Sequence, residues 1–170
     1  MAEEEALVGP ATARLFQAHA EEVWRFLKYL GVRDQDLGDA VQEVFLVAHR
    51  KLPEFRGDAS KRTWLYGIAL RVAKTWRRRR QLVPLGDDDR MVPAMQEHEL
   101  QRRATHELLV WALDQISEAQ RDVFVLHEIE EVPMGEVARR VECGLFTAYS
   151  RLRLARQSLK RALAQKGVKR

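Results

Sequence analysis

The 170-residue sequence contains a single cysteine, Cys143, so the chain cannot form an internal disulfide. Cysteine-based metal knuckles are excluded for the same reason, because they need several thiolates. Glycine and proline are scarce, with 9 and 5 residues, which argues against collagen-like, Pro-rich and largely disordered chains. With 46% hydrophobic residues, the composition instead indicates a globular protein that buries a core.

Long apolar runs are also missing. The longest of them, such as residues 44–48, fall far short of the roughly 20 residues that a membrane-spanning helix needs. The acidic start at residues 3–5 lacks the basic and apolar parts of a secretory signal. We therefore expect a cytoplasmic protein that does not insert into a membrane.

Charge is distributed unevenly, although the formal net charge is only +4. Residues 71–80 hold six basic and no acidic side chains, and residues 145–170 hold eight basic and no acidic ones. Residues 81–100, by contrast, carry five acidic side chains against Arg90 alone. Two separate basic blocks indicate contact with a polyanion at two places, although a solvated helix face would explain either block by itself.

Apolar residues recur with helical spacing along nearly the whole chain, and no segment alternates apolar and polar residues over the length of a strand. The sequence therefore predicts an all-α protein. In the first half, the spacing predicts helices over residues 12–30, 34–52 and 60–80. Thr12 is a candidate N-cap for the first helix, and Ser60 or Thr63 for the third.

Residues 81–97 break this periodicity with Pro84, Gly86 and three consecutive aspartates, a composition typical of a linker. Helical spacing then resumes near Leu100. We expect two small helical domains joined by a flexible acidic linker, with the bounds 1–81, 82–99 and 100–170.

The second half contains the pattern of a helix-turn-helix. Pro133 opens a short helix in which Ala138 is small enough for a second helix to cross it, and residues 142–144 interrupt the helical spacing. A long basic helix is predicted from about residue 145 to 165. Its exposed positions carry side chains that read base edges or neutralise phosphates, namely Tyr149, Ser150, Arg151, Arg153 and Arg156. We expect this helix to enter the major groove of duplex DNA, whereas a generic helical hairpin would not need the basic residues.

One face of the helix predicted from residue 34 combines acidic and polar side chains with a leucine. Asp39, Gln42, Glu43 and Leu46 follow the spacing i, i+3, i+4 and i+7 beside the buried stripe. An exposed leucine among polar groups is typical of a protein-docking face. A solvated acidic face is one alternative, and a metal site of a hydrolase built from Asp36, Asp39 and Glu43 is another. The metal site is disfavoured because no histidine shares the stripe and one helix face rarely supplies a full coordination shell.

A short polar loop at residues 55–63 leads into a helix that begins with Trp64 and Tyr66 and continues into the basic block. Bases turned out of a duplex need aromatic or polar pockets, and the displaced backbone needs positive charge. This segment contains both the aromatic and polar side chains and the positive charge. The alternative is that the two aromatic side chains belong to the core.

In this order the motifs resemble those of bacterial extracytoplasmic-function (ECF) sigma factors of the sigma-70 family. The resemblance rests on DLGDAVQEVF at residues 36–45, FRGDAS at 55–60, TWLYGIA at 63–69 and TAYSRL at 147–152. It covers nearly the whole chain. It implies an initiation factor without cofactor or catalytic activity that binds core RNA polymerase and recognises and melts a promoter. The main alternative is a stand-alone helix-turn-helix regulator that binds duplex DNA without polymerase.

The resemblance also implies roles for individual residues. Those expected to bind core RNA polymerase are Asp39, Gln42, Glu43 and Leu46. Those expected on the unpaired minus-ten strand are Asp58, Ala59, Ser60, Lys61, Trp64, Arg71 and Lys74. Those expected on the minus-thirty-five duplex are Thr147, Tyr149, Ser150, Arg151, Arg153, Arg156 and Lys160. An anti-sigma factor is a further expected partner, and it would mask the docking stripe or the recognition helix.

The second half departs from the family pattern at three positions. Glycine is usual where Glu142 stands and common at Phe146, and a basic residue is frequent at Leu154. A left-handed backbone at Glu142 would cost about 1 kcal/mol, unless Gly144 takes that conformation instead.

Overall fold

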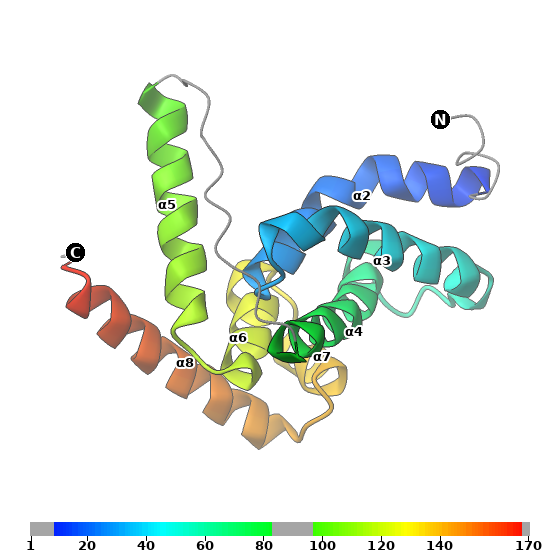
Figure 1. Ribbon diagram of the computed structural model, residues 1–170. Coiled ribbons are helices and arrows are strands. Elements are labelled where there is room, and N and C mark those ends of the chain that lie inside the picture. The colour runs from blue at the N-terminus through cyan, green and yellow to red at the C-terminus, as the bar shows by residue number, and fades with distance from the viewer. Residues whose placement is uncertain (1–8, 83–96, 168–170) are drawn as a thin grey trace.

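The computed structural model describes residues 9–82 and 97–167, with the side chains of 80–82 and 97–102 left aside. These residues are helical and include no strand, so the prediction of an all-α protein is confirmed (Figure 1). The first lobe contains α2 (Pro10–Tyr29), η1 (Asp34–Asp36), α3 (Leu37–Lys51), η2 (Leu52–Glu54) and α4 (Lys61–Leu82). The second lobe contains α5 (Glu97–Asp114), α6 (Glu118–Phe124), the π-helical turn η3 (Val125–Ile129), α7 (Met134–Arg140) and α8 (Leu145–Gln165).

In the first lobe, the apolar stripes of α2, α3 and α4 meet in a common core. Phe26 of α2 stacks on Tyr66 of α4 with ring centroids 4.3 Å apart. The apolar face of α3 is buried throughout, and it consists of Leu37, Ala40, Val41, Val44, Phe45 and Ala48. At the start of α4, Ser60 Oγ accepts a hydrogen bond from the Thr63 amide at 3.1 Å, which selects Ser60 between the two predicted caps.

Thr12 was wrongly predicted as the N-cap of α2. The helix begins two residues earlier at Pro10, after Gly9, and Pro10 loses nothing there because the first amides of a helix have no intrahelical acceptor. Thr12 is instead buried, and its Oγ1 lies 2.9 Å from His49 Nδ1. Its hydroxyl therefore joins the start of α2 to the end of α3.

The helix-turn-helix of the second lobe is formed by α7, the turn at residues 142–144, and α8. Ala138 is buried where the two helices meet. Glu142 adopts φ 55°, whereas Gly144 has φ −66°. The left-handed residue is therefore Glu142 itself, at the cost expected for a side chain in that conformation. Cys143 is half-buried and packs against the core.

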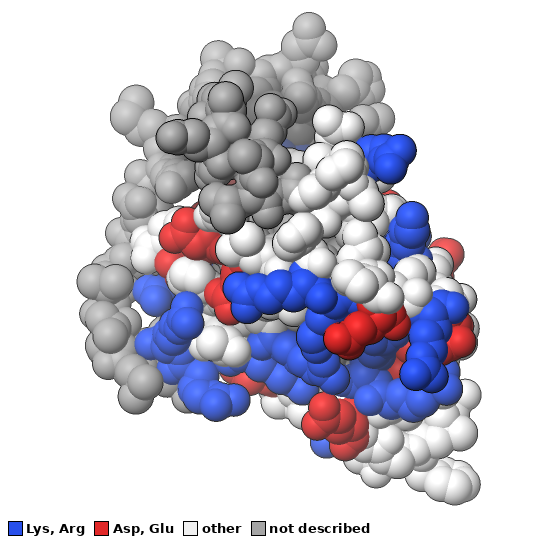
Figure 2. All heavy atoms as spheres, turned by 90° about the vertical axis from the view of Figure 1, so that its right-hand side faces the viewer, with Lys and Arg blue, Asp and Glu red and all other residues white. Residues whose placement is uncertain are grey.

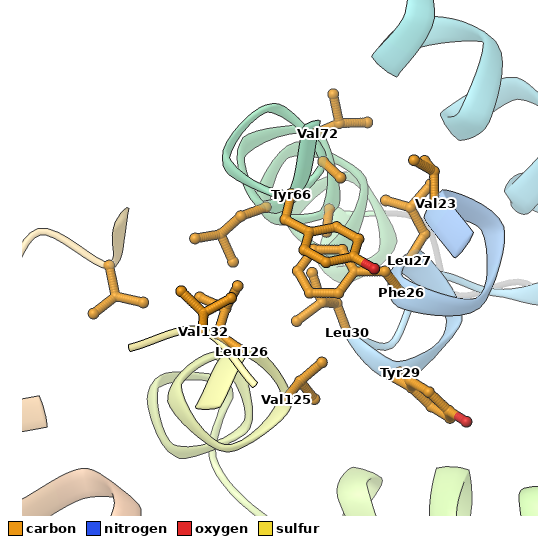
Figure 3. Packing of buried hydrophobic residues seen from close by; sticks show 14 of the residues in the cluster. Val23, Phe26, Leu27, Tyr29, Leu30, Tyr66, Val72, Val125, Leu126 and Val132 are labelled. Carbon is orange, nitrogen blue, oxygen red and sulfur yellow. The ribbon is translucent and has the colours of Figure 1, made fainter. Parts of the chain in front are cut away.

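The two lobes are packed against each other, an arrangement that the sequence did not indicate. Figure 3 shows Tyr66 and Leu30 of the first lobe facing Leu126, Val125 and Val132 of the second. All five side chains are buried and belong to one continuous hydrophobic cluster. We call the contact between the lobes the seam.

Charged side chains are buried in the seam together with the apolar ones. Arg77 of α4 is 5% exposed and Asp122 of α6 is 3% exposed. Arg77 donates from Nη1 to Asp122 Oδ1 at 2.9 Å and from Nη2 to Oδ2 at 3.3 Å. The same Nη1 donates to the carbonyl oxygen of Leu30 at 2.8 Å. This forked pair fixes α4, the end of α2 and α6 in one relative position.

Arg121 approaches the same carbonyl from the second lobe, donating from Nη1 to Leu30 O at 3.3 Å. Burial lowers the pKa of the Arg121 guanidinium, and the carboxylate of Asp114, whose Oδ1 lies 3.1 Å from Nη2, opposes that shift. Gly31, with φ +86°, makes room for this side chain, because a Cβ there would lie 2.0 Å from Arg121 Nη1. The turn after α2 is thus shaped for an arginine of the other lobe.

A second polar contact crosses the seam at Glu130, which is 5% exposed. Its Oε2 accepts hydrogen bonds from Tyr66 Oη and from Arg62 Nη2, both at 2.6 Å. Burial and the neighbouring Glu130 carboxylate raise the pKa of Tyr66 well above its usual range, so the phenol stays protonated and acts as a donor.

Replacing Asp122 with alanine is expected to open the seam. The change would leave Arg77 charged and buried without its carboxylate, which costs about 3–5 kcal/mol, and separation of the lobes would return the guanidinium to water. We expect a larger radius of gyration in small-angle X-ray scattering and a lower urea midpoint of unfolding.

Glu118→Ala is the matched control. Glu118 lies 3.5 Å from Nε of the same arginine, but its side chain is 51% exposed. Its loss should therefore change stability by at most about 1 kcal/mol and leave the scattering profile unchanged. An Asp122→Ala variant with the wild-type profile and stability would contradict this account of the seam.

Candidate functional site

The face predicted to dock a protein lies on the outer side of α3, away from the seam. Asp39 and Gln42 are exposed, and Leu46 is 38% exposed. Glu43 differs from them, because it is half-buried and its Oε2 accepts a hydrogen bond from Trp76 Nε1 at 2.9 Å. The exposed part of the stripe therefore consists of Asp39, Gln42 and Leu46, and Glu43 also holds α3 against α4.

Two of the three carboxylates considered as metal ligands, Asp36 of η1 and Glu43 of α3, are engaged elsewhere, whereas Asp39 is exposed. Asp36 Oδ2 lies 3.2 Å from Arg33 Nε, and Glu43 accepts the indole proton of Trp76. Within residues 9–82 and 97–167, no three Asp, Glu, His or Cys side chains come together in a way that could hold a metal ion. The observed geometry gives no support to the metal-dependent hydrolase.

The loop before α4 presents small and polar side chains to solvent. Asp58, Ser60 and Lys61 are exposed, and Ala59 is half-buried. Trp64 is also half-buried, with its ring centroid 5.1 Å from that of Phe55. Trp64 thus has one side against the lobe and a remaining surface next to the loop.

The arginines of the basic block of α4 lie in two different environments. Arg71, Arg78 and Arg79 are exposed, whereas Arg77 is buried in the seam. Arg77 is hard to single out in the sequence because it lies within a run of arginines. A signal was nevertheless present, since Arg77 continues the buried stripe as the residue at i+4 from Ala73 and i+7 from Leu70.

The helix α8 has a buried face and an opposite exposed one. Its buried face consists of Ala148, Leu152, Ala155, Leu159 and Ala162. The residues predicted for the minus-thirty-five duplex that are exposed are Thr147, Tyr149, Ser150, Arg153, Arg156 and Lys160. Of the predicted positions, one has a partner inside the molecule and one is half-buried. Arg156 donates to Glu128 of η3, and Arg151 is half-buried beside the seam.

A cavity of about 400 Å³ lies between the lobes at the edge of the seam. Its basic lining residues are Lys74, Arg77 and Arg78 of α4 together with Arg151 of α8, and its acidic ones are Glu118 and Asp122 of α6. The fold therefore brings Lys74, predicted for the minus-ten strand, and Arg151, predicted for the minus-thirty-five duplex, to the same cavity. On the face seen from the right-hand side of Figure 1, Lys and Arg side chains gather in a broad band (Figure 2).

Comparison with known families matches each lobe to one region of the same family. The family described as "Sigma-70 region 2" matches residues 15–83, and "Sigma-70, region 4" matches residues 106–159. The first match covers the α3 stripe and the basic block of α4. The second covers the helix-turn-helix. In the described residues, no helix is long and apolar enough to span a bilayer.

Curated relatives match most of the chain. The ECF RNA polymerase sigma-E factor of Escherichia coli K12 is 27% identical over 137 residues, which cover 73% of this chain and 72% of the relative. The RNA polymerase sigma-H factor of Pseudomonas aeruginosa PAO1 is 29% identical over 142 residues, 76% of this chain and 74% of the relative.

Solved structures share the fold across both lobes. The sigma factor RpoE of Bartonella quintana, in complex with the anti-sigma factor NepR, superposes with a TM-score of 0.71 at 19% identity, over 92% of this chain and 98% of that one. CnrH in complex with the cytosolic domain of CnrY gives a TM-score of 0.68 at 22% identity, over 91% and 88%. Since two sigma-70 regions match the two lobes in chain order and the curated relatives are RNA polymerase sigma factors, the chain belongs to the sigma-70 family and is an ECF-type RNA polymerase sigma factor.

Proposed function

We propose that this sigma factor binds core RNA polymerase through α3, the unpaired minus-ten strand through the loop before α4 and α4 itself, and the minus-thirty-five duplex through α8. The observation that carries the proposal is the exposed polar and basic face of α8, which directly follows the turn of a helix-turn-helix. The chain would act as a cytoplasmic, non-enzymatic initiation factor. The three surfaces would belong to the domains 1–81 and 100–170, with residues 82–99 as the linker.

At the minus-thirty-five element, α8 would divide its exposed residues between bases and phosphates. Tyr149, Ser150 and Arg153 lie on the face opposite the buried side chains, so they would meet base edges when α8 lies in the major groove. Lys160 lies farther along the helix and would meet the phosphate backbone. Arg156 would have to exchange Glu128 for a phosphate.

At the minus-ten element, a base would leave the duplex and bind beside Trp64. The polar loop at residues 58–61 would supply hydrogen bonds, and Arg71 and Lys74 would neutralise the separated strand. Lys74 lines the cavity between the lobes. Full engagement of the strand would therefore require the lobes to move apart there.

The closed arrangement of the lobes is incompatible with simultaneous binding of both promoter elements. Their positions place the elements roughly 25 base pairs apart, or about 85 Å along B-form DNA. A compact chain of 170 residues has a radius of gyration of only about 15 Å. We infer that the seam opens before promoter binding. Residues 83–96 could span roughly 45–50 Å when extended, which leaves room for that separation.

An anti-sigma factor is the partner that would bind the closed form. Both solved relatives are complexes, and one of them contains an anti-sigma factor. Such a partner would stabilise the seam and cover the α3 stripe or α8. This part of the proposal explains why the chain has a closed form in which two DNA-binding surfaces share one cavity.

Asp39→Arg combined with Leu46→Ala should weaken binding to core polymerase at least tenfold, which corresponds to about 1.4 kcal/mol. Glu43 is left unchanged because it supports Trp76. Affinity for purified core enzyme would be measured by fluorescence anisotropy, with circular dichroism as a check of helix content. Glu21→Arg, on the exposed surface of α2, is the matched control. Unchanged affinity in a folded double variant would remove the docking role from α3.

Lys61→Ala combined with Arg71→Ala should impair promoter melting more than initial docking. Base extrusion costs a few kcal/mol, which must be recovered by contacts that exist only after strand separation. Run-off transcription from a duplex promoter should therefore fall sharply, and a template with a preformed mismatch bubble at the minus-ten element should restore it. Arg50→Ala, an exposed basic residue of α3, is the control. Equal loss on both templates would show that the two residues act in folding or docking instead.

A further inference from the structure

Phe146 is the most exposed large hydrophobic side chain among the described residues, at 92%. It is the second residue of α8, and the helix around it is well anchored. Gly144 is the N-cap, the amide of Ala148 donates to the Gly144 carbonyl at 3.0 Å, and Ala148 is fully buried. The aromatic ring is therefore held in solvent at a fixed place on a rigid element rather than on a mobile loop.

The position of Phe146 on the helix places it among the candidate base-reading residues. Phe146, Tyr149, Ser150 and Arg153 follow the spacing i, i+3, i+4 and i+7 and form one exposed stripe. The buried residues of α8 lie on the opposite side of the helix. When α8 lies in the major groove, this stripe faces the bases, and residues near the N-terminus of a recognition helix reach base edges.

We infer that Phe146 contacts the C5-methyl group of a thymine in the minus-thirty-five element. Thymine is the base that offers an apolar group in the major groove, and phenylalanine is one of the side chains that contact it. Ser150 and Arg153 can donate hydrogen bonds to the polar edges of neighbouring base pairs. The ring of Phe146 has no such donor and can make only apolar contacts. The inference rests on the proposed minus-thirty-five function of α8, and it adds a specificity-determining residue to it.

The surroundings of Phe146 favour DNA over an apolar partner surface. Residues 145–170 contain eight basic and no acidic side chains, so the stripe is set in positive charge that attracts phosphates. The exposed side chains beside Phe146 on the stripe include the hydroxyls of Tyr149 and Ser150.

The test removes one methyl group at a time from DNA. Holoenzyme reconstituted with core polymerase first selects preferred duplexes from a pool randomised over the minus-thirty-five element. Each thymine of the selected element is then replaced by uracil, which keeps base pairing and lacks only the methyl group. Wild-type binding should fall roughly fourfold at one or two of these positions, as expected for the loss of one buried methyl contact. Phe146→Ala should bind thymine and uracil duplexes equally there, with the wild-type affinity for uracil.

Leu154→Ala is the matched control, because Leu154 is exposed on α8 outside the stripe and should keep the full uracil effect. The inference is overturned if wild type binds all uracil duplexes as tightly as thymine duplexes, or if Phe146→Ala retains the discrimination. The second outcome would mean that a side chain other than Phe146 contacts the methyl group. Failure of wild-type holoenzyme to enrich any minus-thirty-five sequence would instead contradict the proposed function of α8.

Discussion

The buried pair formed by Arg77 and Asp122 determines how the two lobes of this sigma factor meet. Both side chains are buried, so a different packing that separated them would leave a charge buried without its partner. That cost disfavours other arrangements of the lobes. The carbonyl of Leu30 joins α2 to the same pair, and Gly31 leaves the space for Arg121 beside it. Asp39, Gln42 and Leu46 of α3 and the exposed face of α8 stay accessible in this arrangement.

A seam with buried charges suits a contact that has to open. Separation of the lobes returns Arg77 and Asp122 to water, which recovers much of the desolvation cost that their pairing only partly offsets. Glu130 Oε1 is also buried without a hydrogen-bond partner among the described residues, at a cost of about 1–3 kcal/mol. An entirely apolar seam would carry no such desolvation cost. These costs lower the free energy needed to open the seam, which is what the proposed binding to polymerase and promoter requires.

Periodicity along the sequence predicted the helices and most of their buried faces, because each helix places its apolar residues on one side. Ser60 was one of the predicted caps, and its hydroxyl accepts the expected amide hydrogen bond. Thr12 was assigned wrongly because a proline and a glycine before it begin the helix without a side-chain cap. The seam was not predicted, since contacts such as Tyr66 with Glu130 join residues far apart in sequence and leave no periodic signal. The spacing along α4 does put Arg77 on the buried side of the helix, but it does not show Asp122, the distant carboxylate with which Arg77 pairs.

The central claim is that the lobes are closed in the free protein and apart on the promoter, and a distance measurement tests it most directly. Donor and acceptor dyes would be placed on Glu21→Cys and Ala164→Cys, both exposed, in a Cys143→Ser background. We expect efficient energy transfer in the free chain and its loss in the complex with core polymerase and promoter DNA. Equal transfer in both states would contradict the account, as would inefficient transfer in the free chain.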